Sequence, residues 1–233
     1  MISLYTALLG SAWTSLAPAV RRLHEGGASA RGVFRVRRGV RHAGSVPPCC
    51  PGARRVITAL YLFMVQGALG AFDTLYYHEW RARLPGGAPG TAPELTLHGA
   101  RDLIYAVLSG TLPFVRYEGS FAWVLAALLS AEIVITLRDF VVEDSVRRPL
   151  GGVFAGERVT HAVMGILYGA ALGYLVPELL QGSARATALV PWDAPAPLRY
   201  ALPCMAIGVF LSGLRDLGAA HGPSFLRFPW ART

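Results

Sequence analysis

Apolar and polar positions fall into long blocks over residues 56–217, and five of these blocks are apolar runs. Each run is about 20 residues long, and at 1.5 Å rise per residue a helix of that length matches the hydrocarbon thickness of a bilayer. The pattern therefore predicts an all-α fold, an integral membrane bundle of about five transmembrane helices. The predicted helices are 56–77, 95–115, 120–142, 159–180 and 198–217, of which the second is the weakest because Arg101 and Asp102 interrupt it.

The chain before the first run has a different pattern. Within residues 1–20, Leu4, Leu8, Ala12 and Leu16 share one helical face, which favours a short amphipathic helix over a spanning one. A signal peptide would carry basic residues before its apolar part, whereas here the Arg pair follows it. Residues 21–55 are rich in Gly, Arg and Pro, as in a linker. We therefore divide the chain into a basic tail, 1–55, and a transmembrane bundle, 56–233.

Composition supports the membrane interpretation. The sequence is 53% hydrophobic and only 15% charged, which is too apolar for an ordinary soluble domain. The net charge is +8, and nine Arg lie before residue 56. No nucleic-acid motif accompanies this charge, so the predicted partner is the anionic surface of a lipid bilayer. We expect a multi-pass protein of a bacterial inner membrane. The sequence predicts neither its oligomeric state nor a disulfide framework among its three cysteines.

Acidic residues and histidines gather at particular ends of the predicted helices. Successive spans run in opposite directions, so the ends of helices one, three and five share a membrane face with the starts of two and four. The side chains predicted to gather at this face are carboxylates and imidazoles, which are common metal ligands. The candidates are Asp73, His78, Glu94, His98, Glu132, Asp139, Glu143, Glu157, His161, Asp216 and His221.

The spacing of these residues repeats along the chain. Glu, His and Tyr occur at 94, 98 and 105 and again at 157, 161 and 168, on one helical stripe each. An Asp precedes a His by five residues twice, at 73 and 78 and at 216 and 221. We infer a weak internal repeat of two helical hairpins and one closing helix, an arrangement that often places a site at the repeat interface. Gly165, Gly169 and Gly173 form a ladder typical of close helix packing, which we expect inside the bundle.

These residues predict a metal centre. Helix bundles that hold two metals take carboxylates and His from facing helices, usually with a Glu-x-x-His spacing, and here the spacing is Glu-x-x-x-His. The leading hypothesis is a membrane oxidoreductase of the two-iron type acting on a lipid-soluble substrate, with iron, manganese or zinc as the cofactor. The metal would be held by Glu94, His98, Glu157 and His161, with Asp73, Asp139 or Glu143 completing the set.

Two other interpretations stay open at this point. The cluster would be structural if Arg101, Arg138, Arg158 and Arg215 paired with neighbouring carboxylates and tied the helices together. It would be a proton or ion path if the same groups lined a route through the bilayer. Both describe a non-enzymatic membrane subunit. Arg counts at the helix ends favour a cytoplasmic site face, whereas the basic tail favours the reverse orientation.

Two stretches resemble known groups of proteins. LLGSAWTSLAPAVRRLHEGG and ARGVFRVRRG resemble the start of an uncharacterised bacterial domain found beside short-chain-dehydrogenase-like proteins. Residues 56–230 resemble multi-pass membrane proteins of unknown function from GC-rich bacteria. Neither resemblance carries a catalytic motif, so both imply a location and a fold and no reaction.

Overall fold

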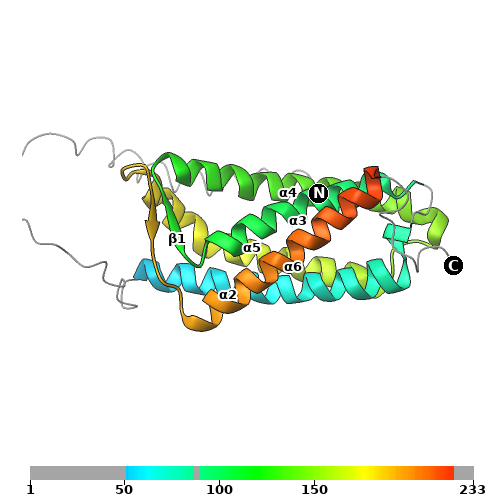
Figure 1. Ribbon diagram of the computed structural model, residues 1–233, viewed down its shortest axis with the longest axis horizontal. Coiled ribbons are helices and arrows are strands. Elements are labelled where there is room, and N and C mark those ends of the chain that lie inside the picture. Colours follow the sequence, from blue (N-terminus) through cyan, green and yellow to red (C-terminus); the bar gives the residue numbers. More distant parts are fainter. Residues whose placement is uncertain (1–50, 87–89, 223–233) are drawn as a thin grey trace, which may run out of the picture. The chain divides into compact units, whose positions relative to one another are not determined.

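The computed structural model describes residues 51–86 and 90–222, and in these ranges the fold is an all-α bundle (Figure 1). Helix α2 (Pro51–Asp73) continues without a break into a π-helix, η1 (Thr74–Arg81). The other long helices are α3 (Ala92–Thr111), α4 (Ser120–Arg147), α5 (Ala155–Ser183) and α6 (Ala196–His221). Short 3-10 turns, η2 (Leu84–Gly86) and η3 (Arg148–Leu150), follow η1 and α4. The predicted helical bundle is confirmed.

Some sequence predictions lie outside the described residues. The amphipathic helix of residues 1–20 and the adjacent thiols of Cys49 and Cys50 belong to this group. The first described helix begins at Pro51, five residues before the predicted boundary of the bundle at 56.

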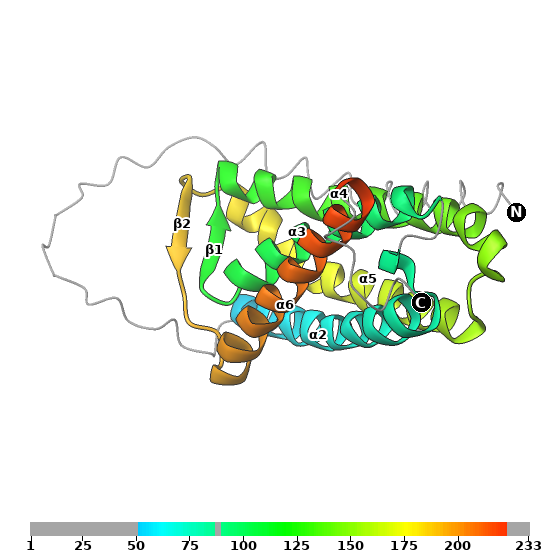
Figure 2. The same ribbon diagram turned by 45° about the vertical axis from the view of Figure 1, so that its right-hand side comes forward.

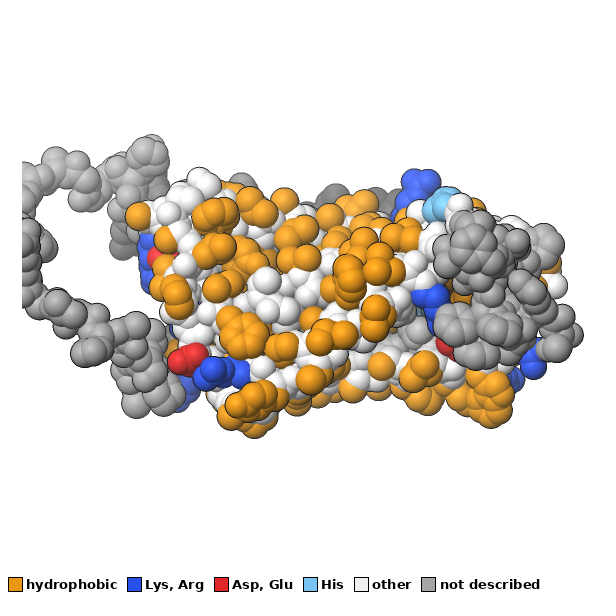
Figure 3. Space-filling model, in the orientation of Figure 1, with side chains coloured by type: hydrophobic (Ala, Val, Ile, Leu, Met, Phe, Trp, Pro, Cys, Tyr) orange, Lys and Arg blue, Asp and Glu red, His pale blue; other side chains and the backbone are white. Residues whose placement is uncertain are grey.

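Four of the five helices are long and apolar enough to cross a membrane, namely 52–81, 120–150, 155–183 and 196–221. Helix α3 does not qualify, which agrees with the polar interruption at Arg101 and Asp102. Large apolar side chains such as Trp123, Val141 and Ile166 are exposed on the outer surface. Figure 3 shows apolar side chains covering the middle of the visible face, with charged side chains near its two ends. This distribution is what a bilayer requires, so the chain is a membrane protein.

The closest helix packing joins helices that are three apart in the chain. Helix α3 packs mainly against α6 and α2 mainly against α5, rather than each against its hairpin neighbour. Gly99 and Gly213 face each other where α3 crosses α6, and a Cβ on Gly99 would lie 2.9 Å from the Gly213 carbonyl oxygen. The ladder at residues 165, 169 and 173 does not pack inside the bundle as expected, since open space surrounds all three positions.

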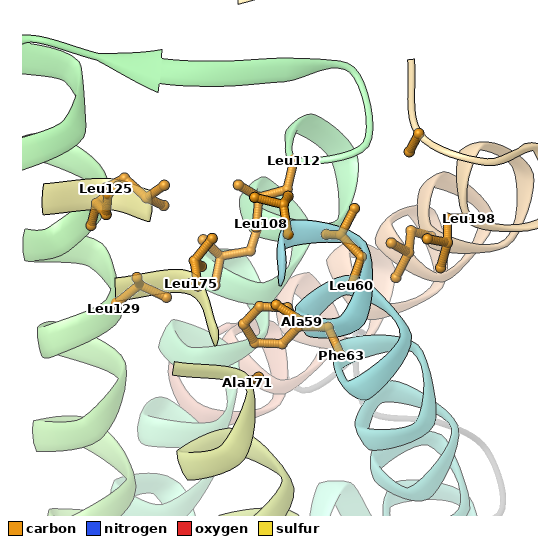
Figure 4. Packing of buried hydrophobic residues seen from close by; sticks show 14 of the residues in the cluster. Ala59, Leu60, Phe63, Leu108, Leu112, Leu125, Leu129, Ala171, Leu175 and Leu198 are labelled. Atoms are coloured by element: carbon orange, nitrogen blue, oxygen red, sulfur yellow. The ribbon is translucent and has the colours of Figure 1, made fainter. Parts of the chain in front are cut away.

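One half of the bundle interior is apolar. Leu108, Leu125, Leu129, Leu175 and Phe63 fill it, together with small residues on α2 and α5 (Figure 4). Beyond this core, β1 (Val115–Glu118) and β2 (Ala188–Pro191) form a short antiparallel pair that the sequence analysis did not predict. The pair lies at the end of the bundle opposite the ends of α2 and α4 (Figure 2). The polar interior therefore belongs to the other half.

Candidate metal centre

The predicted meeting of helix ends occurs in the structure. The last turns of α2, η1 and α4 lie beside the first turns of α3 and α5, and each contributes side chains to one interior cluster (Figure 2). Every carboxylate and imidazole in this cluster is at most 5% exposed. Its members are Asp73, His78, Glu94, His98, Asp139, Glu143, Glu157 and His161.

His78 occupies the middle of the cluster because of the π-helix. Five residues of α-helix would turn His78 about 140° away from Asp73, whereas a π-helix bonds residues five apart and brings them onto one face. His78 Nε2 consequently lies 3.3 Å from Asp73 Oδ2 and 3.1 Å from Glu157 Oε1. In α6 the same five-residue spacing follows a regular α-helix. Asp216 is buried there, and His221 is exposed and bonds Thr96 Oγ1 at 2.7 Å.

His161 and His98 are held against carboxylates from other helices. His161 Nε2 shares a hydrogen bond of 3.0 Å with Asp73 Oδ2, and its Nδ1 lies 3.6 Å from Glu143 Oε2. His98 Nε2 lies 3.0 Å from Asp139 Oδ2. The rings of His78 and His98 stack with centroids 4.5 Å apart. The three imidazoles therefore form one connected group across three helical elements.

Arg147 is the site residue that sequence reasoning missed. Its side chain is fully buried, with Nε 2.8 Å from Glu94 Oε1 and Nη2 2.9 Å from Glu157 Oε1. The guanidinium thus joins the Glu residues of the two Glu-x-x-x-His motifs, α3 to α5. A signal was present in the sequence, because Asp139, Glu143 and Arg147 are spaced four apart and share one stripe of α4.

The predicted ion pairs are only partly correct. Arg215 pairs with Asp216, as expected, and also with Glu79. Arg101 pairs with Asp139, 3.4 Å away, instead of with its sequence neighbour. The predicted partners Arg138 and Arg158 are exposed on the surface. Adjacent residues on a helix point about 100° apart, so neighbours in sequence seldom share one buried site.

Three groups of side chains in the described part of the chain have ligand atoms within 4.8 Å of one another. They are Asp73 with His78 and His161, Glu94 with His78 and His98, and Glu143 with Glu157 and His161. His78 and His161 each belong to two groups, so the groups overlap and form one centre. Four other candidates, Glu132, Asp139, Asp216 and His221, lie outside these groups, although Asp139 contacts His98.

The charges of the centre do not balance within the protein. Five carboxylates, those of residues 73, 94, 139, 143 and 157, lie with two guanidinium groups, those of residues 101 and 147. Three negative charges remain when the histidines are neutral. Buried carboxylates without compensation are costly, so the centre requires added cations or added protons. Three carboxylate oxygens of the centre lack a hydrogen-bond partner in the described residues: Asp73 Oδ1, Asp139 Oδ1 and Glu143 Oε1.

Comparison of the chain with protein-family models, curated proteins and solved structures gave no match. The functional argument therefore rests on the geometry and charge of this centre.

Proposed function

We propose that the protein is a membrane metalloenzyme whose buried His and carboxylate centre holds iron, manganese or zinc. The observation that carries the proposal is the place of His78. Its imidazole joins the carboxylates of α2 and α5 to the His98 ring of α3, so that ligand-type atoms from four elements converge. Mixed imidazole and carboxylate sets of this kind suit these three metals.

The distances in the centre fit ligands of a shared ion. Two atoms that each lie about 2.1 Å from one metal are about 3.0 to 3.4 Å apart at octahedral and tetrahedral angles. The contacts of His78 Nε2 with Asp73 and Glu157 have such lengths, 3.3 and 3.1 Å. The same lengths also suit hydrogen bonds between His78 and these carboxylates, so metal content decides between the two.

The surrounding residues have distinct roles in this proposal. The ligands are His78, His98, His161, Asp73, Glu143 and Glu157. Arg147 holds Glu94 and Glu157 at fixed positions and neutralises part of their charge. Asp139 lies against His98 and is itself fixed by Arg101, as carboxylates beside metal-bound His commonly are.

The reaction we propose is an oxidation or reduction of a lipid-soluble substrate. A redox-active metal, iron or manganese, would supply the electron chemistry when bound. We infer a lipid-soluble substrate from the location of the centre, because the centre lies at the ends of helices whose outer faces are apolar. A substrate dissolved in the bilayer reaches such a centre from the side, without crossing water.

A structural ion-pair network is the second candidate, and Arg147 is the observation that favours it. This buried cation already engages Glu94 and Glu157, two of the predicted ligands. An ion path has less support, since the other half of the interior consists of packed Leu, Phe and Ala. Such a core offers a moving ion no polar partner.

Metal content separates the first two candidates. Protein purified in mild detergent without chelator should carry about one to two equivalents of iron, manganese or zinc per chain, as a two-metal carboxylate site would. When the metal is removed to give stripped protein and the same ion is then added back, the thermal unfolding temperature should rise. Stripped protein whose unfolding temperature responds to none of the three ions would establish the ion-pair network instead.

Substitution of two ligands tests whether the repeated motifs form one site. His98→Ala and His161→Ala should each lose most of the bound metal. The double variant should be little worse than either single variant, because ligands of one centre act as a unit. Separate, additive losses of stability with unchanged metal content would show that the two His residues only fasten helix ends.

A further inference from the structure

A second polar layer lies deeper in the bundle than the metal centre. Four helices each carry a polar side chain seven residues from a member of the centre, about 10.5 Å along the helix axis. Seven residues are close to two helical turns, so both members of each pair face the interior. The pairs are Gln66 and Asp73 on α2, Tyr105 and His98 on α3, Glu132 and Asp139 on α4, and Tyr168 and His161 on α5.

Glu132 is the only carboxylate in this layer and is 3% exposed. Two hydroxyl groups donate to its Oε1, Tyr105 at 2.7 Å and Thr136 at 2.8 Å. The Tyr105 hydroxyl in turn accepts a hydrogen bond of 2.6 Å from Gln66 Nε2, while Gln66 Oε1 has no partner. Tyr168 donates to the Leu129 carbonyl and also interacts with Glu132. Glu132 and Tyr105 thus form one tight pair with a chain of donors behind it.

No salt bridge involves Glu132 in the described part of the chain. The nearest cation along the same stripe of α3 is Arg101, four residues before Tyr105, and it pairs with Asp139 of the metal centre. On the other side of Glu132 the interior is apolar, beginning with Leu129 and Leu108. A carboxylate in such a place needs a proton or a nearby positive charge.

We propose that Glu132 is a proton-exchange site coupled to the metal centre, protonated without metal and ionised with metal; this rests on the proposed function. The proton leaves the Glu132 carboxyl group for solvent when the cation binds. Tyr105 and Thr136 then stabilise the carboxylate by donating to it. Since the apolar half of the bundle closes the route beyond Glu132, the proton enters and leaves on the metal side.

The coupling has an electrostatic cause. A divalent ion in the centre adds positive charge about 10 Å from Glu132, and at that distance in a protein interior it favours the ionised carboxylate by more than about tenfold. The charged and titratable groups between and around the two sites are Arg101, Tyr105, Asp139 and Tyr168. Linkage requires the reverse effect, so protonation of Glu132 weakens metal binding.

Proton release on metal binding tests the proposal. Stripped full-length protein in detergent and weak buffer is titrated with Zn²⁺, and the protons released per bound ion are counted with a pH indicator. Glu132→Gln should release about one proton fewer than the unaltered chain at the same metal stoichiometry. Tyr105→Phe should also release fewer, because the ionised carboxylate loses a donor. Glu178→Gln is the matched control and should release the full number.

The outcomes separate the two proposals. Failure of the unaltered chain to bind Zn²⁺, Mn²⁺ or Fe²⁺ would overturn the metal centre, and the proton exchange with it. Full metal binding with equal proton release in Glu132→Gln would overturn the proton exchange alone. Should Glu132→Gln fail to fold, an infrared difference spectrum between metal-free and metal-loaded protein replaces it. A carboxylic acid band must then disappear on metal loading and shift in Tyr105→Phe, and a spectrum without that band would overturn the proposal.

Discussion

His78 and His221 show how the same spacing from an Asp leads to different roles. Each follows an Asp by five residues at the end of a helix, yet one is buried in the cluster and the other is exposed. His78 contacts two carboxylates, and His221 contacts a hydroxyl of α3. The backbone between the two residues, π-helical in one case and α-helical in the other, makes the difference.

These two histidines give a matched test at the residue scale. His78→Ala should lose most of the bound metal, because this imidazole belongs to two of the three ligand groups. His221→Ala should keep it, since the ring lies outside all three groups. Metal analysis of both purified variants measures the difference. Equal metal content in the two variants would remove His78 from the centre.

Arg147 and Arg148 give a second matched test. Arg147 is buried between two carboxylates, and its neighbour Arg148 is exposed and pairs with Asp144 on the surface. Arg147→Ala should lower the free energy of unfolding by roughly 3 to 5 kcal/mol, because it leaves buried carboxylates without their partner. Arg148→Ala should change it by no more than about 0.5 kcal/mol. The free energy of unfolding of both variants is measured by denaturation in mixed micelles. Similar losses in the two variants would mean that the buried ion pairs of Arg147 do not hold the helices together.

At the scale of elements, the π-helix η1 is the feature with the most consequence. It allows Asp73 and His78, five residues apart, to face the same interior. A regular α-helix achieves this with residues four apart. The spacing and the helix type must therefore change together if the centre is to survive.

This relation predicts opposite effects of a deletion and an insertion at Leu75, whose side chain is 66% exposed. Deletion of Leu75 leaves Asp73 and His78 four apart, so an α-helix keeps both in the centre and metal content should be retained. Insertion of one Ala after Leu75 leaves them six apart, and metal content should fall to that of His78→Ala. Retention of metal in the insertion variant would show that η1 has no part in placing His78.

The described bundle has a polar half and an apolar half. The centre and the Glu132 layer occupy the half where α2 and α4 end, and the core around Leu108, Leu125 and Leu175 fills the other. The exposed surface between the two ends is apolar, as a bilayer requires (Figure 3). A polar site enclosed at one end of the bundle suits binding and chemistry better than conduction.

This asymmetry predicts that the protein does not conduct ions. Liposomes that contain the purified chain should show the proton and cation leak of protein-free liposomes, measured with a pH-sensitive dye after a pH step. The packed apolar half leaves a permeating ion without partners, so its barrier is that of the bilayer itself. A leak that rises with protein content and falls in Glu132→Gln would restore the proton-path interpretation.

The sequence by itself determined the class of fold and the neighbourhood of the centre. Apolar runs of spanning length predicted membrane helices, of which four in the described residues are long and apolar enough to span, and the alternation of helix direction placed Glu94, His98, Glu157 and His161 at one end. The relation between Tyr105 and His98 was also visible, since a fixed spacing on a helix fixes a shared face. These are local properties of the chain, and local periodicity is sufficient to predict them.

Only the tertiary structure decided which side chains meet. The place of Arg147 between two carboxylates depends on α3, α4 and α5 converging, and that approach is set by packing between helices that are distant in the sequence. The π-helix η1 buries His78, whereas the α-helix that ends at His221 leaves this residue exposed, although both follow an Asp by five residues. Helix packing also turned the glycine ladder outward, because small residues favour close contact without specifying the partner. Pairing between helices depends on the shapes of whole surfaces, which no local pattern encodes.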